Sequence, residues 1–293
     1  MLTLAALIWG VAFVAQSVGM DYLGPCAFNG ARSLIGGVAL LPVIALSSRL
    51  RKAPARKETA SSGRKQLLLW GGACGLLLGT ASLLQQAGMQ TASPGKAGFL
   101  TALYIVLVPV LGIFLGRRPG VMVWAGVVLA LTGAYLLSVK GGTGIASGDL
   151  LVLGSAVVFS LHILVIDRAP VSVDGVKLSC VQFFVAGILS FLLAFWLEDF
   201  TWAGMVAAWV PLLYTGVMSS GVGYTLQILG QRTVNPTVAS LILSLESVFA
   251  ALAGWVLLGQ PLSLRELAGC GLVFAAVVLA QLPGKRPQEA NRK

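Results

Sequence analysis

The feature of this sequence that most limits its possible folds is a series of long apolar runs. Ten runs of about 20 residues, separated by short polar or Gly/Pro-containing gaps, follow one another along the chain. Only 10% of the residues are Asp, Glu, Lys or Arg, against about 25% in soluble domains. We therefore expect an all-α integral membrane protein with ten transmembrane helices. The expected helices cover residues 2–20, 26–47, 67–88, 94–115, 121–139, 149–167, 175–197, 205–229, 236–258 and 264–282.

A ten-residue pattern, Gln-x-x-Gly-x-x-Thr-x-x-Pro, occurs twice, with an offset of 142 residues. The first copy occupies 85–94 and the second 227–236, and each closes one apolar run and opens the next. A repeat at this distance indicates that the chain contains two related halves. We expect five helices in residues 1–140, five in residues 141–283, and a disordered cytoplasmic tail in 284–293.

The two prolines of the pattern predict sharp helix starts. Pro94 follows Ser93, and Pro236 follows Asn235. Ser and Asn are favoured N-cap residues, and proline is tolerated at the first helical position because its missing N–H has no partner there. The fourth and ninth expected helices should therefore begin at these prolines.

Basic residues predict the orientation in the membrane. If the N-terminus is cytoplasmic, sixteen Lys and Arg residues fall on the cytoplasmic side and three on the outer side. The positive-inside rule then places both termini in the cytoplasm. Seven of the sixteen lie within 49–65, where we expect contact with anionic lipid headgroups. The net charge of +10 is explained by this segregation, so we expect no nucleic-acid partner.

An odd number of helices per half has a topological consequence. The second half must enter the membrane upside down relative to the first. The loop after the second helix is strongly basic, whereas the corresponding loop after the seventh carries Glu198 and Asp199. Opposite charge at equivalent loops is the pattern expected of an inverted repeat, which is typical of secondary transporters. The predicted fold is two inverted five-helix repeats.

Polar side chains within the apolar runs are the candidates for substrate binding, because such residues usually face a bundle interior or a water-filled cavity. Arg32 could hold a carboxylate, and Glu246 could bind protons or an amine. The candidates are Trp9, Asn29, Arg32, Gln85, Tyr104, His162, Tyr224, Gln227 and Glu246.

Each candidate also has a purely structural alternative. Glu246 could be a neutral carboxyl bonded to a neighbouring helix, and Arg32 could extend toward the interface. His162 could be a hydrogen-bonded interior residue. The two glutamines could join helices near the repeat axis, and tryptophan commonly anchors a helix at the interface.

Signals for catalysis, metals and cofactors are missing from the sequence. One histidine, no paired acidic motif, no P-loop and no GxSxG or HExxH pattern leave little for an enzyme. The four cysteines lie far apart, without a CxxC pair, and are expected to be small packing residues. We therefore expect no catalytic residue, no metal site and no cofactor.

Two stretches resemble the EamA group of the drug/metabolite transporter superfamily. They are Leu-Ile-Trp-Gly-Val-Ala-Phe-Val-Ala at 7–15, together with Arg32, and Leu-Glu-Ser-Val-Phe-Ala-Ala-Leu-Ala-Gly-Trp at 245–255, followed by Leu258-Gly259. The resemblance covers essentially the whole chain. It implies a ten-helix inverted-repeat transporter of the bacterial inner membrane. It also implies a central cavity lined mainly by the first, third, fourth and sixth helices, with contributions from the eighth and ninth.

The expected function is a secondary transporter of small metabolites such as amino acids, working by alternating access and in the export direction. Protons are a candidate coupling ion through Glu246. The main alternative is a drug or amine exporter. A membrane-embedded enzyme, a lipid scramblase, or a receptor or assembly subunit without transport is less well supported, because the sequence lacks a catalytic set and a substantial soluble domain.

Overall fold

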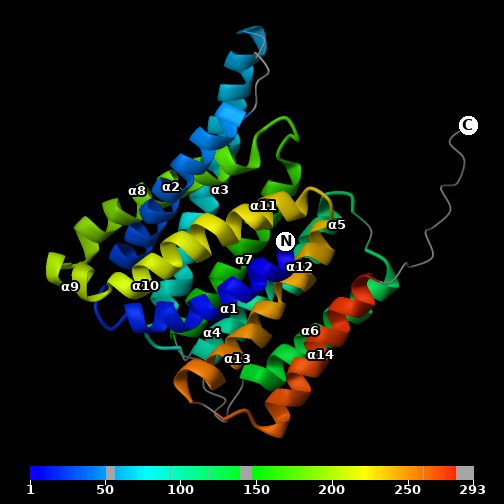
Figure 1. Ribbon diagram of the computed structural model, residues 1–293. Helices are drawn as coiled ribbons and strands as arrows, with labels where there is room; N and C mark the ends of the chain where they lie inside the picture. Colours follow the sequence, from blue (N-terminus) through cyan, green and yellow to red (C-terminus); the bar gives the residue numbers. More distant parts are fainter. Residues whose placement is uncertain (51–56, 93, 118, 139–146, 260, 282–293) are drawn as a thin grey trace, which may run out of the picture.

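The computed structural model describes residues 1–50, 57–92, 94–117, 119–138, 147–259 and 261–281. Within these residues every regular element is a helix (Figure 1). The elements are α1 Leu2–Gly19, α2 Pro25–Leu50, α3 Lys57–Gly88, α4 Pro94–Ala102, α5 Tyr104–Phe114, α6 Val121–Ser138, α7 Ser147–Arg168, α8 Gly175–Leu197, α9 Trp202–Ala207, α10 Trp209–Leu213, the π-helix η1 Tyr214–Tyr224, α11 Thr225–Gln231, α12 Pro236–Leu243, α13 Leu245–Leu258 and α14 Leu264–Gln281.

Seven helical stretches in the described residues are long and apolar enough to cross a membrane, and Val121–Leu137 forms a shorter apolar helix. The expected multi-pass, all-helical membrane protein is therefore confirmed. The expected single span 205–229 is instead divided among α9, α10, η1 and α11. The tail 284–293 and Ser93, the predicted N-cap of the fourth helix, lie outside the described residues.

Both predicted proline starts are present. α4 begins at Pro94 and α12 at Pro236. The Asn235 side chain accepts a hydrogen bond from the backbone N–H of Thr237 at 3.0 Å, as an N-cap should.

Two of the expected helices are interrupted at matching places. The expected helix 94–115 is broken at Leu103, between α4 and α5, and the expected helix 236–258 is broken at Ser244, between α12 and α13. Both interrupted helices also end alike, at glycines with positive φ: 81° at Gly116 and 63° at Gly259. A left-handed backbone costs an L-residue energy and favours glycine, so these residues stop the helices at similar points.

Glycines allow close contact between helices that are far apart in sequence. A Cβ atom on Gly133 of α6 would lie 2.7 Å from the carbonyl oxygen of Gly269 on α14, and the reverse contact is the same. Figure 1 shows these two helices side by side. Small residues at such crossings maximise dispersion contacts, which drive helix association where no water needs to be expelled.

The contacts between helices occur in matched sets. α3 lies against α7 and α8, and η1, in the second half, lies against α1 and α2. In the same way, α5 contacts α7 while α13 contacts α1. Helices from residues 1–138 and from residues 147–281 therefore pack against one another, and the space between them is bounded by helices from both parts of the chain.

An acidic side chain fixes one of the turns between helices. Glu198, just after α8, accepts hydrogen bonds from the backbone N–H groups of Cys26 at 2.6 Å and Ala27 at 2.8 Å. These groups belong to the first turn of α2, where N–H groups lack partners inside the helix. Glu198 thus joins the start of α2 to the end of α8.

The segment 49–65, interpreted from the sequence as a loop, is partly helical. α2 continues to Leu50, and α3 already begins at Lys57. At 26 and 32 residues, both helices exceed the roughly 20 residues that a bilayer requires. Figure 1 shows their ends projecting beyond the rest of the bundle.

Candidate functional site

A cavity lies between helices of the N-terminal part of the chain, residues 1–138, and helices of the C-terminal part, residues 147–281. Its walls come from α1, α2, α3, α4, α5, α7, η1, α11, α12 and α13. The lining residues are Trp9, Ala12, Phe13, Gln16, Arg32, Gln85, Thr101, Tyr104, Phe159, Ile163, Ser219, Tyr224, Gln227, Leu243 and Glu246.

Seven of the nine candidate residues meet at this cavity. They are Trp9, Arg32, Gln85, Tyr104, Tyr224, Gln227 and Glu246. The other two, Asn29 and His162, are fully buried behind the wall, where each bonds to a neighbouring side chain. Most of the polar residues selected from the apolar runs therefore share one internal space.

Arg32 brings a positive charge to the cavity from α2. Its side chain is only 5% exposed. Asn29, one turn earlier, accepts a hydrogen bond from Nε at 2.9 Å, and Gln16 of α1 accepts one from Nη1 at 2.9 Å. Both partners are neutral amides, and no carboxylate in the described part of the chain forms an ion pair with this guanidinium. The amides orient the charge without neutralising it.

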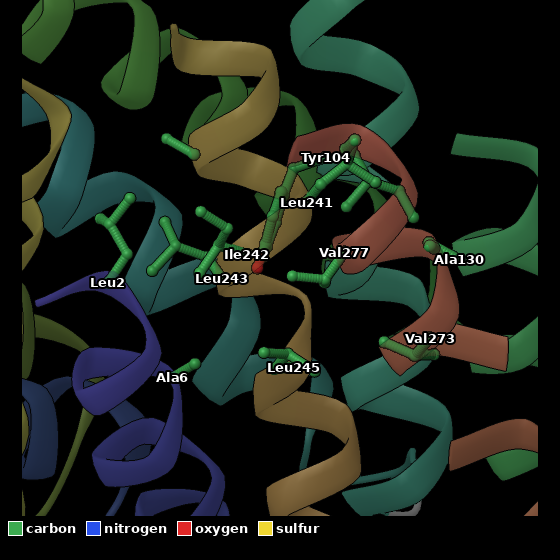
Figure 2. Close-up of a cluster of buried hydrophobic side chains, with 14 of the residues drawn as sticks. Leu2, Ala6, Tyr104, Ala130, Leu241, Ile242, Leu243, Leu245, Val273 and Val277 are labelled. Atoms are coloured by element: carbon green, nitrogen blue, oxygen red, sulfur yellow. The ribbon is translucent and has the colours of Figure 1, made fainter. Parts of the chain in front are cut away.

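Glu246 contributes a carboxyl group from the first turn of α13. It is 5% exposed and accepts a hydrogen bond from the Tyr104 hydroxyl at 3.0 Å. Figure 2 shows the Tyr104 ring crossing the apolar cluster, with its oxygen directed toward the chain between Leu243 and Leu245. Among the described residues, no Lys, Arg or His forms an ion pair with Glu246.

Aromatic rings form one wall of the cavity. The ring centroids of Trp9 and Tyr224 are 4.5 Å apart, and those of His162 and Tyr224 are 6.0 Å apart. His162 Nε2 lies 3.1 Å from Gln182 Oε1, which holds the imidazole behind Tyr224. The Trp9 indole N–H donates to the carbonyl oxygen of Ser219 in η1 at 3.3 Å. His162 thus supports the aromatic wall and does not line the cavity.

The matched glutamines lie on the cavity but are bonded differently. Gln85 donates from Nε2 to the Thr101 hydroxyl at 3.0 Å. Gln227 is 2% exposed, and its Oε1 has no hydrogen-bond partner among the described residues. An unsatisfied buried carbonyl costs free energy, so Gln227 offers an acceptor that a bound molecule could use.

Several lining residues were not selected from the sequence. Gln16 carried a usable signal, because it is an amide inside the first apolar run. Thr101, Ser219, Phe13 and Phe159 carried none, since hydroxyls and aromatic rings are common in membrane helices that bind nothing. The cavity also receives Arg32 from α2, a helix that the family resemblance did not include among the lining helices.

Within the described residues, no group of three or more His, Cys, Asp or Glu side chains could hold a metal ion. The chemistry available at the cavity is one guanidinium, one carboxyl, three amides, several hydroxyls and an apolar wall. These groups suit binding of a small polar or amphipathic molecule.

A multi-pass helical bundle with a polar cavity between its halves has the structure of a membrane transporter. The chain belongs to the EamA-like transporter family, whose model matches residues 1–139 and 146–282. That family is part of the drug/metabolite transporter superfamily, so the sequence resemblance is confirmed.

Similar proteins carry transporter names. A protein of Archaeoglobus fulgidus named "Uncharacterized transporter" is 30% identical, over 96% of this chain and 84% of its own length. The inner membrane transporter YedA of Escherichia coli K12 is 24% identical, over 94% and 88%. The "Probable terminal-alkyne amino-acid exporter" of Streptantibioticus cattleyicolor is 27% identical, over 97% of each.

A solved crystal structure shares the fold. It superposes with a TM-score of 0.72 at 20% sequence identity, and the match covers 95% of this chain and 96% of the other. At this level of identity, the likeness concerns the arrangement of the helices alone.

Proposed function

We propose that this protein is a secondary transporter that exports amino acids across the bacterial inner membrane by alternating access. The observation that carries the proposal is that one guanidinium and one carboxyl group line the same cavity, each without an ion-pair partner in the described part of the chain. Arg32 and Glu246 are each 5% exposed, line the same space and have no oppositely charged partner among the described residues.

Buried charges without partners are costly, and the cost is larger inside a membrane protein than at a surface. A ligand with both a carboxylate and an ammonium group would neutralise both. Arg32 presents a preorganised guanidinium, which suits carboxylate recognition, and Glu246 suits an ammonium group. An α-amino acid carries these two groups, and the rings of Trp9 and Tyr224 suit an apolar side chain.

The transport mechanism would use two inverted five-helix halves, residues 1–140 and 141–283. The matched helix contacts, the two interrupted helices and the two separate stretches that match the family support this division. An inverted repeat can open its central cavity to either side by exchanging the conformations of its halves. The concentration of basic residues in 49–65 supports cytoplasmic termini and contact of that segment with anionic lipid headgroups.

Glu246 is also the candidate site for proton coupling. It is the acidic side chain that lines the cavity, so proton binding and substrate binding would occur at one place. A proton-coupled exporter should respond to an imposed pH gradient in proteoliposomes, whereas a facilitator should not.

A drug or amine exporter is the second candidate, favoured by the aromatic wall beside a carboxyl group. The position of Arg32 counts against it, because a buried guanidinium on the same cavity repels a cation that lacks a carboxylate.

Counterflow in proteoliposomes tests the proposal. Proteoliposomes that contain the purified protein are loaded with unlabelled amino acids. The uptake of labelled amino acids, amines and carboxylic acids is then compared. We expect uptake of amino acids with apolar side chains in preference to the matching amine or acid. Exchange of the amine alone at an equal rate would favour the drug or amine exporter.

Charge-neutralising variants test the residue roles. Arg32→Gln and Glu246→Gln should each raise the KM for an amino acid about 10- to 100-fold, the range expected when a hydrogen bond to a charged group is lost. Lys177→Gln and Asp199→Asn remove charges from exposed positions and serve as controls. Unchanged KM in both cavity variants, at normal expression, would contradict the proposed substrate class.

A further inference from the structure

Tyr104 and Glu246 occupy the same position in the two halves. They are 142 residues apart, which is the offset of the repeated Gln-x-x-Gly-x-x-Thr-x-x-Pro pattern. Tyr104 is the first residue after the interruption at Leu103, and Glu246 is the second residue after the interruption at Ser244. Their side chains nevertheless bond to each other, at 3.0 Å.

A contact between equivalent residues has a special place in an inverted repeat. The pseudo-twofold axis that relates the halves carries each residue onto its equivalent, so a bond between equivalents is carried onto itself. When the halves exchange conformations, its length should change little. Most other contacts between the halves are carried onto a different pair of residues, and so they can form on one side while breaking on the other.

The ion pair between Arg117 and Asp167 illustrates the other kind of contact. It joins the end of α5 to the end of α7. Residue 259, the position that matches 117 by the offset, is Gly259, which has no charged group. This ion pair therefore has no counterpart in the second half, so the symmetry of the repeat does not require it to persist when the halves exchange conformations.

The carboxyl of Glu246 has room for a second partner. The Tyr104 hydroxyl donates to Oε1, while Oε2 receives no hydrogen bond from the described residues. Both residues line the cavity. One oxygen is thus held by the first half, and the other is left for a ligand.

We propose that Tyr104 and Glu246 form a single axial site, in which the tyrosine orients the carboxyl that binds the ammonium group of the substrate, in both the inward- and outward-facing forms. Tyr104 is a positioning residue in this site. The inference rests on the proposed function, because it concerns the same cavity and the same substrate.

Exchanging the two residues tests the site. If both positions lie on the axis, Tyr104→Glu combined with Glu246→Tyr restores one hydroxyl and one carboxyl at the same point. We expect each single variant to lower amino-acid counterflow about tenfold or more, because it creates two carboxyls or two phenols, and the double variant to recover most of the loss. Arg117→Asp combined with Asp167→Arg serves as the control, because it exchanges the two partners of a contact that does not lie on the axis.

The exchange also has a readout that is independent of transport. In detergent, the melting temperature should fall in each single variant and rise again in the double variant. If wild-type protein transports no amino acid, the proposed function fails, and the melting temperatures still test the axial contact. A folded double variant that is no better than the poorer single variant, by flux and by melting temperature, would overturn the axial site.

Tyr104→Phe provides a second test should the exchanged protein fail to fold. This variant keeps the ring and loses the hydroxyl. We expect the KM for phenylalanine to rise about fivefold or more, while inhibition by 3-phenylpropanoate, which lacks the ammonium group, stays unchanged. A merely structural role would weaken both alike, and that outcome would also overturn the proposal.

Discussion

The two interrupted helices are closely alike in backbone and different in chemistry. α4–α5 and α12–α13 both start at a proline, break at about the same depth and end at a glycine with positive φ. After the break, however, one presents the phenol of Tyr104 and the other the carboxyl of Glu246. The two interrupted helices therefore share a backbone course but present different side chains to the cavity.

A second pair of equivalent segments diverges in backbone as well. α3 is one continuous helix of 32 residues, whereas its counterpart is divided into α9, α10, the π-helix η1 and α11. π-Helical segments are often found at functional sites. Here η1 provides Ser219 and Tyr224 to the cavity, while α3 provides Gln85. The second half therefore supplies the carboxyl group and the irregular backbone.

The crossing of α6 and α14 should show a large effect on stability, because both helices contribute a glycine to it. Gly133→Ala and Gly269→Ala place a methyl group 2.7 Å from a backbone oxygen, so each should lower the free energy of unfolding by about 1–3 kcal/mol, as overpacking does. At Gly126, the oxygen of Ala276 lies at 3.2 Å, so Gly126→Ala should cost less.

Thermal unfolding in one detergent gives the ranking of these variants. Gly271→Ala on α14 is the control, because nothing lies within 4 Å of the added Cβ. Equal melting temperatures for the Gly126 and Gly269 variants would contradict this ranking. They would show that the two ends of the crossing are equally tightly packed, although the distances to the nearest backbone oxygen differ.

The two helix-ending glycines should respond equally. Gly116→Ala and Gly259→Ala force an L-residue into the left-handed region, at a cost of about 1–2 kcal/mol. Neither added Cβ meets an atom within 4 Å, so the loss should be due to the backbone alone. Chemical denaturation of both variants measures it. If the two losses in the free energy of unfolding differ more than twofold, the two interrupted helices do not end in equivalent ways.

The ion pair between Arg117 and Asp167 should have the smallest effect. The two side chains are 30% and 13% exposed, so Asp167→Asn should lower stability by only about 0.2–1 kcal/mol, and less at high salt. Melting curves at low and high salt measure the loss. A salt-independent loss above that range would assign this contact a larger role in holding the halves together.

Sequence reasoning identified the features that depend on composition and spacing. Apolar runs predicted a multi-pass helical protein, the paired prolines predicted two helix starts, and the motif at 245–255 pointed to the EamA-like family. The cost of burying polar groups in lipid also selected candidates, and seven of nine meet at the cavity. The same criterion failed to separate Asn29 and His162 from them, because it identifies buried polar residues without saying what they face.

The sequence by itself determined the class of protein, because membrane insertion depends on the length and polarity of each segment. It also placed Tyr104 and Glu246 at the repeat offset. Only the tertiary structure decided that their side chains bond to each other, that Asn29 and Gln16 hold Arg32, and that the helices break at Leu103 and Ser244. Those outcomes depend on how helices from opposite halves pack, and packing is set by many contacts between residues far apart in the chain.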